Sequence, residues 1–228
     1  MPPTASTVTV DLATPRGPAR AHIDEPSAQP SVLLVLGHGA GGGVTAPDLL
    51  AVRAAALAAG AVVARVEQPY RVAGRRSPAP AAHLDEAWTA VVAALRECYP
   101  GLPLVTGGRS SGARVACRTA AATGAAAVIA LAFPLRPPAH PERSRAAELL
   151  MAGVPVLVVN GDRDPFGVPE ETEAVTVRVI TGADHSLRRA VPQLGAVVAN
   201  LLGRIVTEGK QSTTRGVGMV SHACSEDS

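Results

Sequence analysis

The residue best placed to do chemistry is a serine between two glycines, Ser110 in the stretch Gly-Arg-Ser-Ser-Gly at residues 108–112. An apolar run precedes this stretch and an alanine-rich, helix-forming run follows it. Glycines two positions before and after the serine let a strand turn sharply into a helix, because they add no side chain where the two elements nearly touch. Such a corner presents the serine hydroxyl as a nucleophile. The neighbouring Ser111 fails the same test, because an arginine and an alanine occupy its flanking positions.

A serine hydroxyl is a weak nucleophile that needs a base beside it, and the base needs an acid to orient it. His185 follows the last expected strand, and the loop after the preceding strand carries Asp162 and Asp164. In an open parallel sheet the carboxyl ends of the strands meet at one edge, where the loops that follow them converge. The chain order Ser110, Asp164, His185 therefore predicts a nucleophile, an acid and a base at that edge. A glycine-rich loop at residues 37–43 follows another expected strand and joins them there.

The elements that must position these residues alternate between strands and helices along the chain. Strands are expected at residues 7–12, 19–23, 31–36, 61–66, 104–105, 126–132, 156–159 and 175–180. Helices are expected at residues 45–60, 84–98, 115–121, 143–151 and 189–206. This alternation predicts an α/β fold, with a mostly parallel sheet covered by helices on both faces. Residues 1–206 are expected to form one domain, and the Gly-, Ser- and Thr-rich residues 207–228 a flexible polar tail.

Composition limits the classes of function. The chain has 228 residues, 47% of them hydrophobic, which suits one domain with a sizeable core. A net charge of +2 argues against binding of nucleic acid or of a membrane surface. The first residues lack the pattern of a secretion signal, and the longest apolar stretch, residues 124–135, is shorter than the roughly 20 residues of a membrane span. Three cysteines without metal-ligand spacing favour a reducing, cytoplasmic location.

Five motifs make the chain resemble the small, lidless, dienelactone-hydrolase-like branch of the α/β-hydrolase superfamily. They are GHGAGG at residues 37–42, GGRSSGAR at 107–114, PLRPP at 134–138, GDRDPFG at 161–167 and DHS at 184–186. The resemblance covers about residues 31–202 and implies an α/β-hydrolase fold without a lid domain. It implies Ser110 as nucleophile, Asp164 as acid and His185 as base. Dienelactone hydrolases proper use a cysteine nucleophile, where this chain has serine.

The resemblance also assigns the groups around this triad. Its pattern places the acid three residues after a glycine, which favours Asp164 over Asp162. It assigns the oxyanion hole to the backbone N–H groups of Ala40 and Ser111, and it implies neither a metal nor an organic cofactor. The glycine-rich loop lacks the GxxxxGK[ST] pattern, and we reject a phosphate-binding role for it.

The expected function is that of a serine hydrolase that cleaves a small carboxylic ester or thioester through an acyl-enzyme. An open cleft is expected for the substrate, walled by four side chains: Tyr70, Phe133, Leu135 and Phe166. Three arginines, at positions 71, 75 and 76, either solvate their loop or attract an anionic substrate. Two alternatives remain open, namely a non-catalytic scaffold protein of the same fold, and a peptidase or acyltransferase that uses the same triad.

Overall fold

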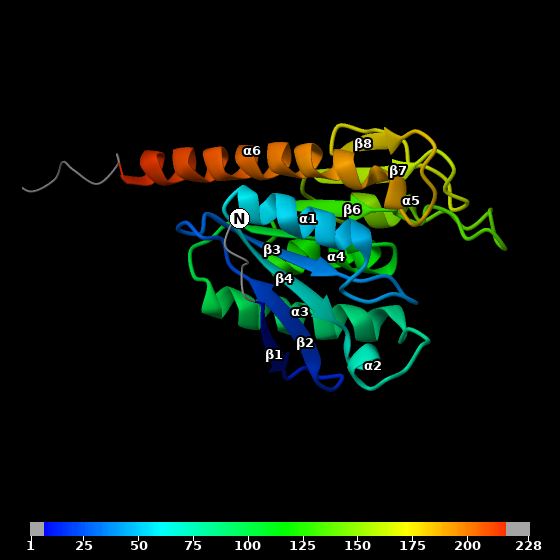
Figure 1. Ribbon diagram of the computed structural model, residues 1–228, viewed down its shortest axis with the longest axis horizontal. Coiled ribbons are helices and arrows are strands. Elements are labelled where there is room, and N and C mark those ends of the chain that lie inside the picture. The colour runs from blue at the N-terminus through cyan, green and yellow to red at the C-terminus, as the bar shows by residue number, and fades with distance from the viewer. Residues whose placement is uncertain (1–6, 218–228) are drawn as a thin grey trace, which may run out of the picture.

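Eight strands form one sheet in the computed structural model, which describes residues 7–217 (Figure 1). The strands are β1 (Val8–Leu12), β2 (Ala19–Asp24), β3 (Val32–Gly37), β4 (Ala61–Glu67), β5 (Leu104–Arg109), β6 (Ala127–Leu131), β7 (Val156–Gly161) and β8 (Val175–Ile180). Their order across the sheet is β1-β2-β4-β3-β5-β6-β7-β8. Strands β1 and β2 are antiparallel to their neighbours, and the other six are parallel to one another. The expected mostly parallel α/β sheet is confirmed.

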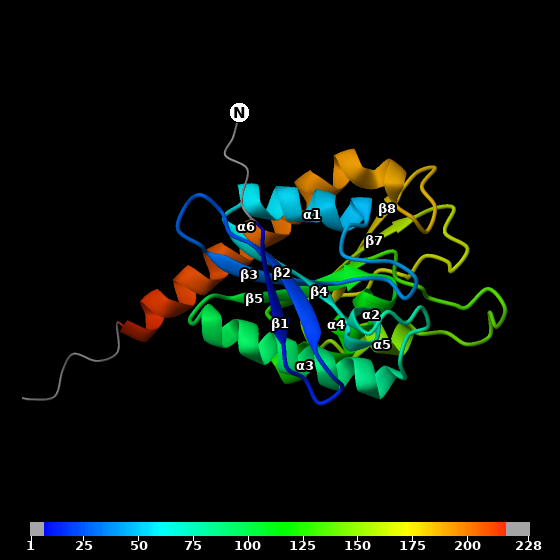
Figure 2. The same ribbon diagram turned by 60° about the horizontal axis from the view of Figure 1, so that its bottom comes forward.

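Helices cover both faces of the sheet, as the sequence predicts (Figure 2). Helices α1 (Pro47–Ala58) and α6 (Val191–Val217) pack together on one face. Helices α3 (Ala81–Cys98), α4 (Ser111–Thr123) and α5 (Ala146–Leu150) cover the other. Two short turns complete the described chain, α2 (Pro69–Val72) after β4 and the 3₁₀ turn η1 (Arg188–Ala190) before α6. Residues 132–145 join β6 directly to α5, and the chain from residue 7 to 217 contains no separate lid domain.

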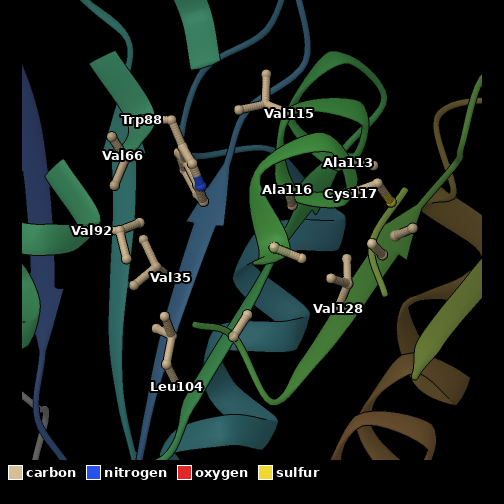
Figure 3. Packing of buried hydrophobic residues seen from close by; sticks show 14 of the residues in the cluster. Val35, Val66, Trp88, Val92, Leu104, Ala113, Val115, Ala116, Cys117 and Val128 are labelled. Carbon is tan, nitrogen blue, oxygen red and sulfur yellow. The ribbon is translucent and has the colours of Figure 1, made fainter. Parts of the chain in front are cut away.

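The central strand β3 divides the hydrophobic core into two layers. All six of its residues are buried, because a parallel strand with helices on both sides has no face toward water. Val35 packs in the layer under α3 and α4, where the chain's one tryptophan, Trp88, is 1% exposed (Figure 3). Leu34 and Leu36 lie in the opposite layer, under α1 and α6. Close packing on both faces fixes the strands that carry the site.

Helix α6 is longer than the sequence predicts. Its expected end, Val206, is where the apolar periodicity stops, but the helix continues to Val217. Residues 207–217 contain no proline, and their Glu, Lys, Gln and Arg residues favour a helix, so the helix continues through the glycine at position 209. The rest of the expected tail, residues 218–228, lies outside the described residues.

The apolar part of α6 packs on the domain. Residues 188–207 are long and apolar enough to cross a membrane by length and composition alone. However, Leu194, Val198 and Leu202 are each fully buried in the layer shared with α1. That packing accounts for the apolar composition of the helix.

Candidate active site

Ser110 lies at the corner between β5 and α4, in a strained backbone conformation. Its φ of 53° with ψ of −109° is sparsely populated by residues other than glycine. A Cβ atom added to Gly108 or to Gly112 would lie 2.4 Å from the carbonyl oxygen of Gly37 in β3. Both glycines are therefore required for β3, β5 and α4 to meet, which is the physical basis of the glycine spacing around Ser110.

Three loops bring Ser110, His185 and Asp164 into one hydrogen-bonded chain. His185 Nε2 lies 3.0 Å from Ser110 Oγ, and its Nδ1 lies 2.8 Å from Asp164 Oδ2. Asp164 is 7% exposed, and its other carboxylate oxygen accepts a hydrogen bond of 2.9 Å from the N–H of Phe166. Because a carboxylate only accepts, Nδ1 of His185 donates to it, and Nε2 is left to accept the hydroxyl proton of Ser110.

The other carboxylates of these loops have different partners. Asp162 is exposed and accepts a hydrogen bond of 2.7 Å from the N–H of Gly182, which ties the loop after β7 to the loop after β8. Asp184 accepts the hydroxyl and the N–H of Ser186. Of the two aspartates considered for the acid, the structure thus brings Asp164 to His185.

The two backbone N–H groups expected at the oxyanion hole are available to a ligand. Ser111 is the first residue of α4, where helix N–H groups have no partner within the helix and carry partial positive charge. Within the described residues, neither its N–H nor that of Ala40 donates a hydrogen bond. A Cβ atom added to Gly39 would lie 3.6 Å from Cβ of Ser110, so the glycine-rich loop passes directly beside the serine.

His38 braces this glycine-rich loop. Its ring is 3% exposed; Nδ1 donates to the carbonyl of Gly39 at 2.8 Å, and Nε2 accepts the N–H of Gln68 at 3.1 Å. The neutral ring satisfies both contacts, whereas a second ring proton would point at the Gln68 N–H. Burial lowers the pKa of His38, and the nearby Arg71 lowers it further. The ring therefore links the loop after β3 to the end of β4 as a neutral group.

This environment predicts a loss of stability in mild acid. In the unfolded chain His38 titrates near pH 6.5, and the folded protein resists the same protonation, so stability rises with pH below that value. The contribution is complete above about pH 6.5 and is lost on acidification, by at most about 1.4 kcal/mol per pH unit. Urea unfolding of the wild type and of His38→Gln between about pH 5 and 8 measures it. Parallel pH profiles for the two proteins would contradict the assignment.

Sequence reasoning missed Arg109, the residue just before the serine. Its Nε lies 2.9 Å from Oδ2 of Asp48 in the first turn of α1, and its Nη2 donates to the carbonyl of His185 at 2.8 Å. A Cβ atom added to Gly39 would lie 2.9 Å from Nη1. The side chain of Asp48 is fully buried, and this burial raises its pKa against the opposing effect of Arg109. One guanidinium thus contacts the His185 loop, the glycine-rich loop and α1. No sequence motif predicts these three contacts.

Asn160, at the end of β7, is a second residue that the motifs did not reveal. It is fully buried, its Oδ1 accepts the N–H of Phe133, and its Nδ2 donates to the carbonyls of Phe133 and Gly167. These bonds fasten the loop after β6 to the loop that carries Asp164. The sequence feature that could have indicated its role is its position before a glycine at the end of a strand.

The expected substrate wall needs correction. Phe166 is partly exposed, and its ring centroid lies 4.5 Å from that of His185, so it stands beside the triad. Phe133 is fully buried, and Leu135 is 4% exposed; both pack in the core layer under α3 and α4. Tyr70 is 6% exposed, and its hydroxyl donates to the carbonyl of Ala40 at 2.9 Å. Of the four side chains, only Phe166 has both exposed surface and contact with the triad.

Cys117 is fully buried in α4, and its burial raises the pKa of the thiol to about 12, so it packs as a small apolar residue. Within residues 7–217, no group of three His, Cys, Asp or Glu side chains is arranged to hold a metal ion.

Comparison with known proteins places these features in a wider group. The model of a family described as an alpha/beta hydrolase domain matches residues 30–211. No curated protein matches the chain.

Solved structures with the same fold share little sequence with this chain. A lidless α/β serine hydrolase from Xanthomonas campestris superposes with a TM-score of 0.70 at 21% identity, covering 89% of this chain and 95% of that one. An α/β serine hydrolase homologue from Coxiella burnetii gives 0.71 at 18% identity, with coverages of 86% and 97%. Est1E from Butyrivibrio proteoclasticus gives 0.73 at 16% identity, with coverages of 87% and 99%.

Proposed function

The chain belongs to the α/β-hydrolase domain family, and from this membership we propose that it is a serine hydrolase that cleaves a small carboxylic ester or thioester. The observation that carries the proposal is the hydrogen-bonded chain from Ser110 through His185 to Asp164. The fold alone hosts many functions, so the argument depends on this site. Two structural neighbours, at 18% and 21% identity, are named as a serine hydrolase homologue and a lidless serine hydrolase, which supports the proposal at the level of fold.

In the first half-reaction Ser110 is the nucleophile. Its Oγ attacks the substrate carbonyl carbon while Nε2 of His185 takes the hydroxyl proton. The negative charge moves to the carbonyl oxygen, where the N–H groups of Ala40 and Ser111 stabilise it. Asp164 stabilises the imidazolium through Nδ1. When the tetrahedral intermediate collapses, the bond to the alcohol or thiol breaks, and the leaving group takes the proton from His185.

In the second half-reaction water replaces the leaving group. His185 removes a proton from water, and the resulting hydroxide attacks the acyl carbon that is bonded to Ser110 Oγ. The intermediate collapses to a free carboxylic acid, and Ser110 recovers its proton from His185. With no lid domain among the described residues to cover an extended chain, the proposed substrates are small.

A fluorophosphonate probe tests the proposal directly, because it bonds only to an activated serine. We expect the folded wild type to be labelled at Ser110, as identified by mass spectrometry of the labelled peptide. Labelling should be lost in Ser110→Ala and retained in Ser111→Ala, which removes a hydroxyl one residue away and keeps the backbone N–H.

Two outcomes would count against it. Absence of labelling in a wild type whose folding is verified by circular dichroism would favour the non-catalytic alternative. Loss of labelling only in Ser111→Ala would show that the nucleophile is Ser111 and not Ser110.

Arg109 is expected to act as a positioning residue for His185. Arg109→Met removes the donor to the His185 carbonyl and leaves the buried Asp48 carboxylate unpaired. We expect kcat for a short ester to fall about 10- to 100-fold, and the free energy of unfolding to fall by about 3 kcal/mol. Unfolding and steady-state kinetics measure the two effects separately.

A second substitution distinguishes positioning from charge pairing. Adding Asp48→Asn to Arg109→Met removes the unpaired charge, so it should restore most of the stability while kcat stays low. Recovery of kcat together with stability would show that Arg109 serves only as a counter-ion for Asp48.

A further inference from the structure

A pocket of about 360 Å³ opens at the edge of the sheet that carries the site. It lies between the turn joining β1 to β2, the short helix α2, and the start of α3. The β1–β2 turn reaches this edge because Arg20 at the start of β2 pairs with Glu67 at the end of β4. Only β3 separates β4 from β5, and adjacent strands lie about 4.8 Å apart, so β4 is about 10 Å from the strand that ends at Ser110.

Basic side chains line this pocket, and no acidic side chain does. Arg16, Arg75 and His83 are the basic residues among those that line it. Arg16 is already paired with Glu86 at 2.6 Å. Within residues 7–217, neither Arg75 nor His83 forms a salt bridge, and the Glu86 carboxylate that pairs with Arg16 also interacts electrostatically with His83. The pocket therefore holds two donors suited to a carboxylate or a phosphate.

The remaining wall suits an apolar chain. Pro69, Val72 and Leu84 present hydrocarbon surface to the pocket. Gln68 is 6% exposed; its Nε2 donates to the carbonyl of Leu84, while its Oε1 accepts no hydrogen bond within the described residues. This oxygen is itself buried, so the pocket offers a ligand the apolar side chains of the wall and not the Gln68 carbonyl.

The pocket also adjoins the oxyanion loop. Tyr70 lines it, and the hydroxyl of the same residue donates to the carbonyl of Ala40. Gln68, Tyr70 and Leu84 further line a cavity of about 10 Å³ that borders Ser111. The side chain of Tyr70 thus connects the pocket to the loop that carries Ala40.

We propose that this pocket binds an anionic group, carboxylate or phosphate, at the far end of the substrate while the ester carbonyl lies at Ser110. The inference rests on the proposed function and names the substrate class: esters with a short apolar chain that ends in a negative charge. Arg75 and His83 bind the charge, and the apolar wall contacts the chain. The size of the pocket agrees with this, since small-molecule sites begin at roughly 300 Å³.

Matched pairs of esters test the inference. The 4-nitrophenyl half-esters of succinic, adipic, suberic and sebacic acid are compared with neutral esters of the same chain length, and a second series carries the carboxylate on the alcohol side. We expect kcat/KM for the anionic member to exceed that of its neutral partner by about tenfold in one series, at the lengths that reach the pocket. In the double variant Arg75→Ala/His83→Ala this ratio should fall to one or below.

Arg76→Ala is the matched control, because it removes the same charge from the next residue, which does not line the pocket. It should keep most of the preference, since an exposed charge that does not line the pocket is screened by salt. A preference absent from both series, or one that survives in the double variant, would overturn the inference. Turnover of the neutral esters without charge preference would leave the proposed hydrolase intact, whereas turnover of no ester in either series would refute both.

Inhibition then distinguishes the two anions. Hexanoate, hexyl phosphate and the neutral 1-hexanol are compared as competitors of a neutral ester. Stronger inhibition by either anion than by the alcohol, weakened in the double variant, supports the site and identifies its preferred group. Inhibition by both anions that is no stronger than that by hexanol would count against it.

Discussion

Replacing Ser110 with alanine is expected to lower kcat for a short acyl ester by about 10⁴- to 10⁶-fold. The substitution removes the only oxygen that Nε2 of His185 contacts in the described structure, at 3.0 Å, so no acyl-enzyme can form. The change deletes a single atom from a partly exposed side chain and leaves the backbone turn in place. Steady-state kinetics with 4-nitrophenyl acetate, with circular dichroism to verify folding, measure the effect.

The double variant Ser110→Ala/His185→Ala gives a sharper form of this experiment. Because the two side chains act as one unit, the second substitution should lower the remaining rate little further. Ser111→Ala is the matched control and should keep most of kcat, since the oxyanion contact assigned to it uses its backbone N–H. Additive losses in the double variant would indicate that Ser110 and His185 act independently, contrary to the proposed mechanism.

Gly112→Ala is expected to damage both folding and activity, although it adds only one carbon. The new Cβ would lie 2.4 Å from the carbonyl oxygen and 2.5 Å from the carbonyl carbon of Gly37, and neither backbone atom can rotate away. Helix α4 must therefore move away from β3, and it takes the N–H of Ser111 with it. We expect the free energy of unfolding to fall by about 1–3 kcal/mol or more, and kcat to fall at least about 100-fold. Urea unfolding and ester kinetics measure the two quantities.

Gly203→Ala in α6 provides the matched glycine control. No atom lies within 4 Å of a Cβ added there, and the position is exposed in a helix. The same substitution should therefore stabilise the protein, by up to about 1 kcal/mol, through helix propensity. If Gly112→Ala proved as harmless as Gly203→Ala, the close approach of β3 and α4 would not constrain the elbow.

The parts of the fold and site that the sequence predicted depend on local spacing. The two glycines around Ser110 report a steric demand that can be read from five consecutive residues. The order of Ser110, Asp164 and His185 could be combined with strand-end positions, because parallel strands place all such loops at one edge. Asp164 could be separated from Asp162 only through the family pattern, and the contact at 2.8 Å agrees with that choice.

The contacts that sequence reasoning missed join segments that no local pattern relates. Arg109 and Asp48 lie far apart in the chain, and their ion pair depends on how α1 sits against the elbow. Phe133 and Leu135 follow a strand end, which suggested a place at the substrate, but the loop folds back and buries both in the core. Burial is a property of the whole packing, so the position of these residues after a strand could not predict it.

Helix α6 has a practical consequence for handling the protein. Its 27 residues span about 40 Å, whereas a strand of six residues spans only about 20 Å. The helix starts after β8, at the edge that carries Ser110 and His185, and runs back across the sheet until it projects past the opposite edge (Figure 1). The C-terminal part of α6 is therefore a suitable site for immobilisation. A molecule attached to a bead or electrode through this helix would have its reactive edge facing the solution.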